Sequence, residues 1–135
     1  MSDKPAFSNT HEIRVLWTDT DPAGITFYGN YYKWMDECAY YLFRKAGIHW
    51  EEWQEKWEAL GIPLISAHGD FRSPSKFGDV LAVESHVSDW GRSSFTITHI
   101  FRNGDRIPAE GWEKRVWCRG DPSDPSTFAS MPIPE

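Results

Sequence analysis

Apolar positions along this chain recur with two different periods, and the change of period separates a helical part from a sheet part. Residues 11–17 alternate in steps of two, which predicts a short strand. From about Gly29 to Ala46 the apolar positions recur in steps of three and four, which predicts a long amphipathic helix. Gly47 follows as a typical helix stop. The apolar stripe of this helix comprises Tyr31, Trp34, Met35, Cys38 and Leu42.

A second, shorter helix is expected from about Trp50 to Leu60, where Trp50, Trp53, Trp57 and Leu60 share one face. Beyond Pro63 the period of two returns and continues to about Arg119. Strands are predicted at about 64–72, 80–90, 95–101 and 109–119. Asn103-Gly104 is a strong hairpin signal between the last two. We expect these four strands to form a meander.

Taken together, the order is one strand, two helices and then four strands, which favours the α+β class. At 135 residues, the chain is expected to form a single domain over residues 1–135. Residues 1–9 are expected to be a loose polar lead. Residues 120–135 are rich in Pro, Ser and Asp, and are expected to cover a sheet edge or to fray.

The net charge of −6 argues against a general nucleic-acid-binding protein, although a few local arginines suffice for one phosphorylated ligand. No apolar run is long enough to span a membrane, and the N-terminus lacks the apolar core of a secretory signal. Both cysteines lie in apolar patterns, which favours a reducing, cytoplasmic location. The 8 Trp and 8 Phe predict a bulky core with an oligomer interface.

The segment most informative about chemistry runs from Asp19 to Glu37 and joins an acidic turn to the start of the long helix. Pro22 fixes its own φ and pushes Asp21 toward an extended conformation, while Gly24 permits a tight bend. A carboxylate is therefore expected close to free N–H groups at a helix N-terminus. Such groups stabilise negative charge, including the oxyanion of acyl transfer. The pattern indicates a hydrolase that acts on an activated carbonyl.

The run DTDPAGITFYGNYYKWMDE resembles the signature of the 4-hydroxybenzoyl-CoA thioesterase family, in particular its branch for aromatic acyl-CoA esters. The resemblance extends from about Ile13 to about Trp117. It implies a hotdog fold, in which a five-stranded antiparallel sheet wraps a long central helix. It also implies a homodimer or homotetramer with active sites at the subunit interface. Coenzyme A would be part of the substrate, with no separate cofactor.

By this resemblance, Asp21 is the catalytic carboxylate. It would act either as a general base toward water or as a nucleophile that forms an acyl-aspartyl anhydride. A carboxylate beside a helix N-terminus stays ionised, which slightly favours the nucleophile. The resemblance makes the Tyr28 N–H an oxyanion donor, aimed by the bend at Gly24. A cap of the turn is the alternative role for Asp21, and Asp19 is expected to order the turn.

The same resemblance indicates substrate-binding roles for Asn30, Tyr31, Trp34, Asp36 and Arg92. Asn30 would orient the turn, position a water or cap the helix, and Tyr31 would border the acyl site or pack. Asp36 would reach a ring substituent in the partner's acyl pocket, or lie at the surface. Arg92 is the candidate for the phosphates of coenzyme A. Family members are often basic at the positions of Gly91 and Ser93, which weakens that assignment.

The sequence therefore predicts hydrolysis of an aromatic acyl-CoA, such as 4-hydroxybenzoyl-CoA. The alternatives are a short-chain aliphatic acyl-CoA thioesterase, a non-catalytic hotdog module that binds acyl-CoA, and a cone-shaped α+β hydratase or isomerase. The histidines and cysteines lack the spacing of a closed metal site, so no metal is expected.

Overall fold

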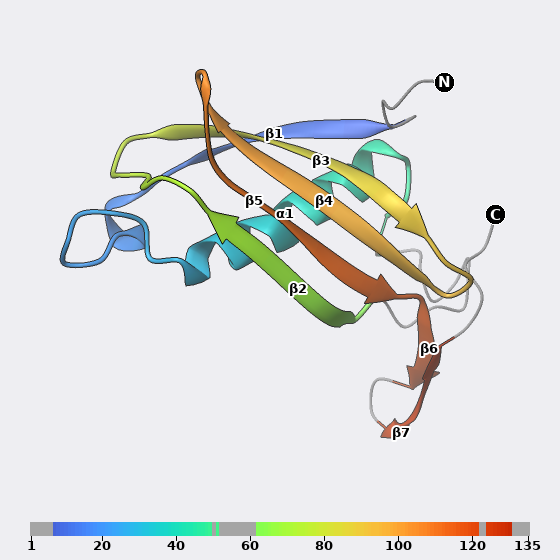
Figure 1. The fold of residues 1–135 in the computed structure, drawn as a ribbon. Coiled ribbons are helices and arrows are strands. Elements are labelled where there is room, and N and C mark those ends of the chain that lie inside the picture. Colours follow the sequence, from blue (N-terminus) through green and yellow to red (C-terminus); the bar gives the residue numbers. More distant parts are fainter. Residues whose placement is uncertain (1–6, 50, 52–61, 122–123, 131–135) are drawn as a thin grey trace.

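The computed structural model describes residues 7–49, 51, 62–121 and 124–130, and in these residues one long helix lies against a curved sheet (Figure 1). The helix is α1 (Gly29–Lys45), and a short 3-10 turn, η1 (Trp17–Asp19), precedes it. The antiparallel sheet contains five strands in the order β1-β3-β4-β5-β2. They are β1 (Ser8–Arg14), β2 (Leu64–Phe71), β3 (Val80–Trp90), β4 (Ser94–Asn103) and β5 (Arg106–Val116). The predicted α+β arrangement is confirmed.

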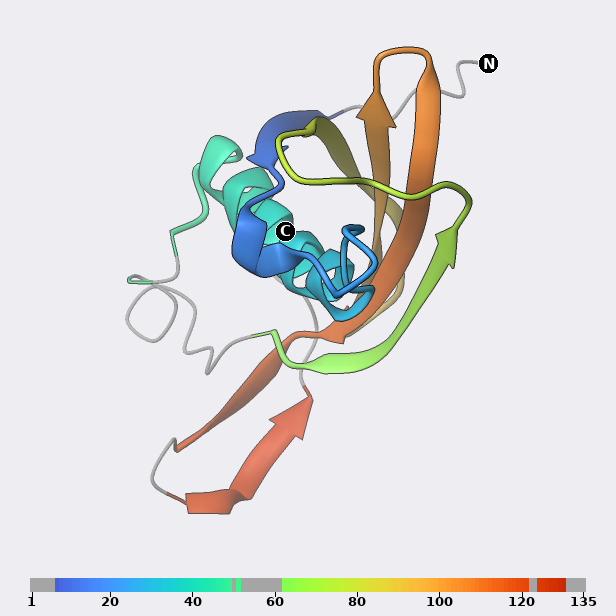
Figure 2. The same ribbon diagram turned by 90° about the vertical axis from the view of Figure 1, so that its left-hand side faces the viewer.

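Strand order corrects one expectation, because β2 does not join the meander. Only β3, β4 and β5 pair consecutively, whereas β2 pairs with β5 and β1 pairs with β3 at the two edges. The connection from β2 to β3 must therefore cross one end of the sheet (Figure 2). It is anchored on both sides, since Arg72 N–H donates to the Pro108 carbonyl and Gly78 N–H donates to the Val15 carbonyl.

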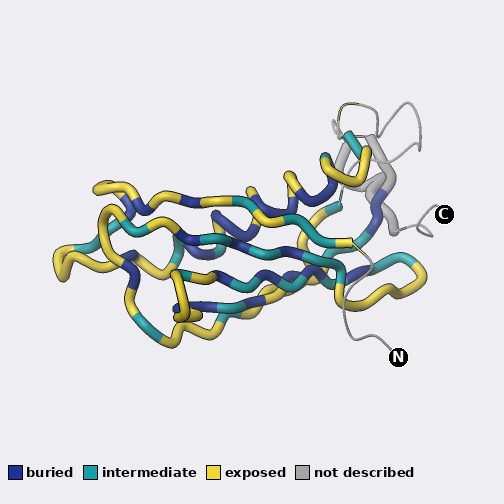
Figure 3. Tube along the Cα trace, turned by 90° about the horizontal axis from the view of Figure 1, so that it is seen from above, coloured by how far each residue is buried: buried dark blue, intermediate teal, exposed yellow. Residues whose placement is uncertain are grey.

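Helix α1 lies in the hollow of the sheet, and its sheet-facing side is buried along its length (Figure 3). The prediction of Gly29 to about Ala46 agrees to within one residue, because the helix ends at Lys45 and Ala46 is its C-cap. Gly47 takes a φ of +84° there, and two bonds close the end: Gly47 N–H to the Arg44 carbonyl and Ile48 N–H to the Phe43 carbonyl. This is a Schellman motif, which satisfies carbonyls that the helix leaves free. All members of the predicted apolar stripe are buried: Tyr31, Trp34, Met35, Cys38 and Leu42.

The termini differ from the sequence prediction. Strand β1 begins at Ser8, so residues 8 and 9 pair with β3 and are not part of a loose lead. The expected loose tail instead contains an antiparallel hairpin of β6 (Cys118–Asp121) and β7 (Asp124–Ser130). Backbone pairing at Asp121↔Asp124 closes this hairpin and needs no apolar pattern. The helix expected at residues 50–60 lies almost entirely outside the described residues.

The core forms between α1 and the inner face of the sheet, where β3 and β4 contribute Leu81, Val83, Ile97 and Phe101. Two titratable side chains share this inner face, His99 and Glu113, and both are buried. At the β2 edge, Leu64, Ile65 and Phe71 are exposed. Among the described residues, no helix is long and apolar enough to cross a lipid bilayer.

Candidate active site

A cleft of about 400 Å³ opens where the loop between β1 and α1 meets the connection from β2 to β3. Both segments lie at the N-terminal end of α1 (Figure 1). The cleft is lined by apolar, hydroxyl and charged side chains: Asp21, Ile25, Thr26, Tyr28, Tyr31, Phe71, Arg72, Ser73, Pro74 and Ser75. Two of the predicted catalytic residues, Asp21 and Tyr28, therefore line one cavity.

Backbone geometry fixes the Asp21 turn. Gly24 has a φ of +82°, a conformation that residues with a Cβ rarely adopt, and its N–H donates to the Asp21 carbonyl at 2.8 Å. The Asp21 N–H closes the loop by donating to the Ile25 carbonyl at 2.8 Å. One carboxylate oxygen of Asp21, Oδ1, accepts the Ala23 N–H at 2.9 Å. The predicted bend is confirmed, and the Asp21 side chain is half-exposed with Oδ1 held by its own turn.

Free N–H groups lie at the start of the helix. The first helical bonds run from the Asn30 N–H to the Phe27 carbonyl and from the Tyr31 N–H to the Tyr28 carbonyl, at 3.0 and 3.1 Å. Within the described part of the chain, the N–H groups of Tyr28 and Gly29 have no acceptor, and no side chain caps the helix. Such unpaired donors, together with the helix dipole, attract an anion.

Asp19 and Asn30 hold the turn in place. The Asp19 side chain is buried, and its Oδ2 accepts the Leu16 N–H at 2.8 Å. Its carbonyl accepts both the Asn30 side-chain amide at 2.8 Å and the Phe27 N–H at 3.0 Å. The Asn30 side chain thus bonds to the turn, as one of its three predicted roles requires. Asp19 orders the turn, as expected.

The buried floor of the cleft carries three hydroxyl groups, those of Thr26, Tyr31 and Ser75. The Tyr31 hydroxyl donates to Ser75 Oγ at 2.9 Å, and Thr26 Oγ1 donates to the Ser75 carbonyl at 2.9 Å. Burial raises the pKa of the Tyr31 phenol, so this group stays protonated. A carboxylate, unpaired amide donors and neutral hydroxyls thus surround one cavity, a set suited to attack on a carbonyl whose oxygen becomes negative.

Residues 23–109 match the family model of the thioesterase superfamily. The chain belongs to this superfamily. Its activity is thioester hydrolysis, in agreement with the groups that line the cleft.

Two curated relatives extend the comparison of this thioesterase. It is 33% identical over 95 residues to the 4-hydroxybenzoyl-CoA thioesterase of Pseudomonas sp. strain CBS-3, covering 70% of this chain and 67% of the relative. It is 27% identical over 109 residues to the 1,4-dihydroxy-2-naphthoyl-CoA hydrolase of Synechococcus sp. strain WH7803, covering 76% of this chain and 71% of the relative.

Solved structures agree with the fold. A gentisyl-coenzyme A thioesterase superposes with a TM-score of 0.82 at 35% identity, covering 94% of this chain and 97% of that one. The structure of the Pseudomonas 4-hydroxybenzoyl-CoA thioesterase gives a TM-score of 0.87 at 27% identity, covering 96% of this chain and 95% of that one. The fold is the hotdog fold that the resemblance implied.

Four of the five expected substrate-binding residues do not line the cleft of the same chain: Asn30, whose side chain bonds to the Asp19 carbonyl, and Trp34, Arg92 and Asp36. Trp34 is buried in the core, where its ring meets that of Tyr31 edge-on at 5.2 Å between centroids. Arg92 lies in the turn between β3 and β4, at the opposite end of the helix from the Asp21 loop (Figure 1). Asp36 lines a separate cavity and pairs with Arg115. In a single chain, Asp21, Tyr28 and Tyr31 therefore line one cleft, and the other four predicted substrate-binding residues do not.

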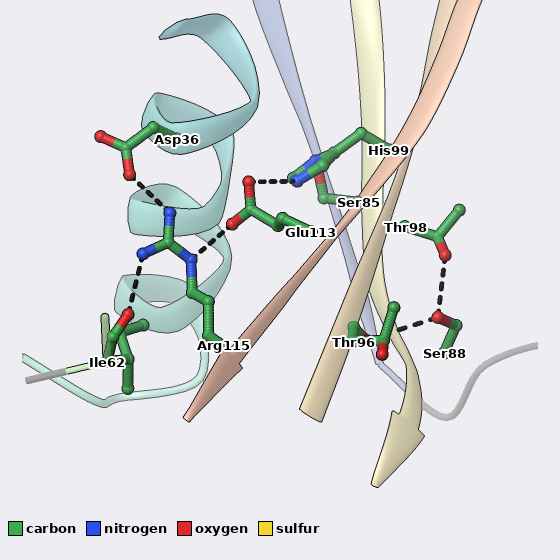
Figure 4. Close-up of polar contacts among 9 residues, drawn as sticks. All are labelled: Asp36, Ile62, Ser85, Ser88, Thr96, Thr98, His99, Glu113 and Arg115. Carbon is green, nitrogen blue, oxygen red and sulfur yellow. Dashed lines mark hydrogen bonds and ion pairs between the residues drawn. The ribbon is translucent and has the colours of Figure 1, made fainter. Parts of the chain in front are cut away.

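The thioesterase also contains a buried polar network that the sequence analysis missed (Figure 4). Arg115 joins Asp36 to Glu113, and Glu113 Oε2 lies 3.5 Å from His99 Nε2. His99 Nδ1 and Ser85 Oγ form a hydrogen bond of 2.7 Å. The signal was present in the alternation, because His99 falls in phase with the apolar positions of β4, and Glu113 with Ala109 on β5. In the described ranges, no three His, Cys, Asp or Glu side chains gather as a metal site.

Proposed function

We propose that this thioesterase hydrolyses an aromatic acyl-CoA to the carboxylic acid and free coenzyme A. One observation carries the proposal: the Asp21 carboxylate and Tyr28, whose N–H is unpaired among the described residues, line the same cleft. The relatives support the choice of acyl group. Their names specify 4-hydroxybenzoyl-CoA, gentisyl-CoA and 1,4-dihydroxy-2-naphthoyl-CoA, all of which carry hydroxylated rings.

The mechanism follows from these groups. The thioester oxygen accepts hydrogen bonds from the N–H groups of Tyr28 and Gly29, which stabilise the negative charge that develops on it. The Asp21 carboxylate attacks the acyl carbon, the C–S bond breaks, and coenzyme A leaves as a thiolate that takes a proton from solvent. Water then cleaves the anhydride and restores Asp21. In the alternative mechanism, Asp21 instead takes a proton from the water that attacks the thioester.

Cleft shape supports an aromatic acyl group over an aliphatic one. The rings of Tyr28 and Phe71 lie 6.2 Å apart between centroids and both line the cleft. A volume of about 400 Å³ also falls in the usual range of small-molecule sites. Flat apolar walls of this kind favour a ring, whereas a short aliphatic chain would leave much of their surface uncovered.

We further propose that two copies pair along β2 and that pairs associate into a tetramer. Among the described residues, no strand pairs with the outer side of β2, where Leu64, Ile65 and Phe71 are exposed, and such edges are covered in stable proteins. In this assembly, Asp36 of one copy contacts a ring hydroxyl of the acyl group held by the other. Arg92 receives a phosphate of coenzyme A. Asp36 and Arg92 both lie outside the cleft of their own chain. In this assembly they therefore contact a substrate that is bound in the cleft of the second copy.

The decisive experiment offers the protein benzoyl, hydroxybenzoyl and aliphatic CoA esters and follows the released thiol. We expect Asp21→Asn to lower kcat on the aromatic esters by at least about 100-fold while substrate binding is retained. Asp89→Asn, at an exposed position on β3, is the matched control. Normal turnover by Asp21→Asn would refute the role of this carboxylate. Preference for aliphatic esters would refute the substrate class.

Single turnover in ¹⁸O-labelled water separates the two roles of Asp21. Label that enters the Asp21 carboxylate supports the anhydride, because hydrolysis at that carboxyl exchanges its oxygen. Label that appears only in the released acid shows that water attacked the acyl carbon, which the general base requires and the anhydride also permits, so this outcome gives the anhydride no support.

A further inference from the structure

Arg115 is held more firmly than a surface arginine needs to be. Its Nε donates to Glu113 Oε1 at 2.7 Å, one terminal nitrogen donates to the Ile62 carbonyl at 2.9 Å, and the other donates to Asp36 Oδ1 at 2.7 Å (Figure 4). Its side chain is 12% exposed, whereas that of Asp36 is 74% exposed. The bonds to Glu113 and to the Ile62 carbonyl leave this guanidinium little freedom. It can therefore hold the exposed Asp36 carboxylate in one position.

A small cavity of about 190 Å³ lies beside this ion pair. Its walls are mainly apolar, with the ion pair at one side: Asp36, Ala39, Tyr40, Phe43, Ile48, Ile62 and Arg115. A cavity of about 150 Å³ lined by apolar side chains accepts benzene. The space beside Asp36 is therefore of the right size for one aromatic ring with a polar substituent.

Stability alone does not account for the buried part of the network. The Glu113 side chain is 4% exposed, and taking a carboxylate out of water opposes folding by several kcal/mol before its pairing is counted. Apolar residues of similar volume often stabilise a core as well as a buried ion pair does. An exposed pair such as Arg102 with Glu84 adds little stability and leaves both side chains mobile. The arrangement is thus better suited to holding Asp36 in place.

The remaining polar atoms of the pair match a hydroxyl group. Within the described residues, Asp36 Oδ2 makes no hydrogen bond, and three of the five N–H groups of Arg115 are used. The pair therefore offers one acceptor and free donors side by side. A phenolic hydroxyl both donates and accepts, so it can bond to both partners at once.

We propose that Arg115, supported by Glu113, is a positioning residue that holds Asp36 to receive a ring hydroxyl. The thioesterase then prefers hydroxylated aryl groups to unsubstituted ones. This inference rests on the proposed function, because the ring reaches Asp36 as part of an acyl-CoA bound between two copies. Arg115 does not touch the reacting atoms, and its effect is on discrimination between substrates.

The test measures the ratio of kcat/KM for 4-hydroxybenzoyl-CoA to that for benzoyl-CoA. Arg115→Lys keeps the charge but cannot make three bonds in a plane, and we expect it to lower the ratio by about 10-fold, with benzoyl-CoA hydrolysis largely unchanged. Glu113→Gln retains an oxygen that accepts the bond from Arg115 Nε, so its kcat/KM ratio should stay close to that of the wild-type protein. Arg102→Lys, in the exposed pair on β4, is the control and leaves the ratio unchanged.

A ratio unaltered in folded Arg115→Lys would overturn the positioning role. Should that variant not fold, Asp36→Asn removes the held carboxylate at an exposed position and must lower the ratio as well. Non-hydrolysable thioether analogues of the two esters separate this inference from the proposed function. If the wild-type protein cleaves neither ester but binds the hydroxylated analogue more tightly, the hydrolase proposal fails. The proposal that Arg115 holds Asp36 for a ring hydroxyl then stands. Equal binding of both analogues would overturn the proposal that Arg115 holds Asp36 to receive a ring hydroxyl.

Discussion

Two polar regions lie on the same helix of this thioesterase, and they are built in opposite ways. The cleft at the start of α1 takes its shape from one short segment, in which backbone bonds around Asp21 and Gly24 set the turn. The cavity beside Asp36 is assembled from parts far apart in the chain. Arg115 joins α1 to β5 and to the Ile62 carbonyl through side-chain bonds.

This difference determines how each region responds to substitution. Where the backbone aims the groups, conformation matters more than side-chain identity, so a change at a glycine affects chemistry more than stability. Where buried side chains hold one another, the loss of one partner leaves another charge without compensation. The following substitutions test this contrast.

The largest effect on stability is expected at Glu113. Glu113→Ala leaves the Arg115 guanidinium, itself mostly buried, without its carboxylate partner, and we expect a loss of about 3 kcal/mol in the free energy of unfolding. Glu84→Ala removes an exposed pair with Arg102 and should lose less than about 1 kcal/mol. Urea denaturation of both variants measures the difference. Similar losses in the two variants would show that removal of Glu113 does not leave the Arg115 charge uncompensated in a buried site.

At Gly24 the expected effect is mainly on rate. An alanine there has open space around its Cβ but must adopt a φ of +82°, which costs about 1–2 kcal/mol. If the turn relaxes, Asp21 and the Tyr28 N–H lose their alignment, and kcat should fall by about 10- to 100-fold. Gly104→Ala has a similar backbone strain, with a φ of +62°, at the β4–β5 hairpin. It should lose comparable stability and retain its activity, as thiol-release kinetics and thermal unfolding would show.

Sequence alone predicted the first region far better than the second. Pro22 restricts the backbone locally and Gly24 permits the positive φ of the bend, so the turn and the start of the helix at Gly29 could be inferred from neighbouring residues. Nothing local indicates that Arg115 meets Asp36, because that contact spans 79 positions and depends on strand order. The meander prediction failed for the same reason: pairing of β2 with β5 is a long-range choice.

For the burial of Glu113, the alternation gave a weak signal through its phase with Ala109, and the larger apolar residues of β5 point the other way. In β5 the apolar-looking Trp112 is exposed while Glu113 is buried, since the small residues Ala109 and Gly111 fix which face points inward. Met35 packs close to Gly111, where a Cβ would lie 2.9 Å from its sulfur. The inner face of β5 is thus set by the helix that covers it, whereas the large apolar side chain of Trp112 would favour the opposite face.

The smallest effect concerns Cys38, which lies in the core near Glu113. Burial, with added repulsion from Glu37 and Glu113, raises the pKa of this thiol from 9.0 to about 12. Only the unfolded chain then loses the proton near pH 9, so stability is complete below that pH and decreases as the pH rises toward 12. Between pH 8 and pH 9.5 we expect a loss of about 0.8 kcal/mol from this group. Cys38→Ala should remove that part of the pH dependence in urea titrations. An identical slope in both proteins would show that the thiol ionises equally in the folded and unfolded states.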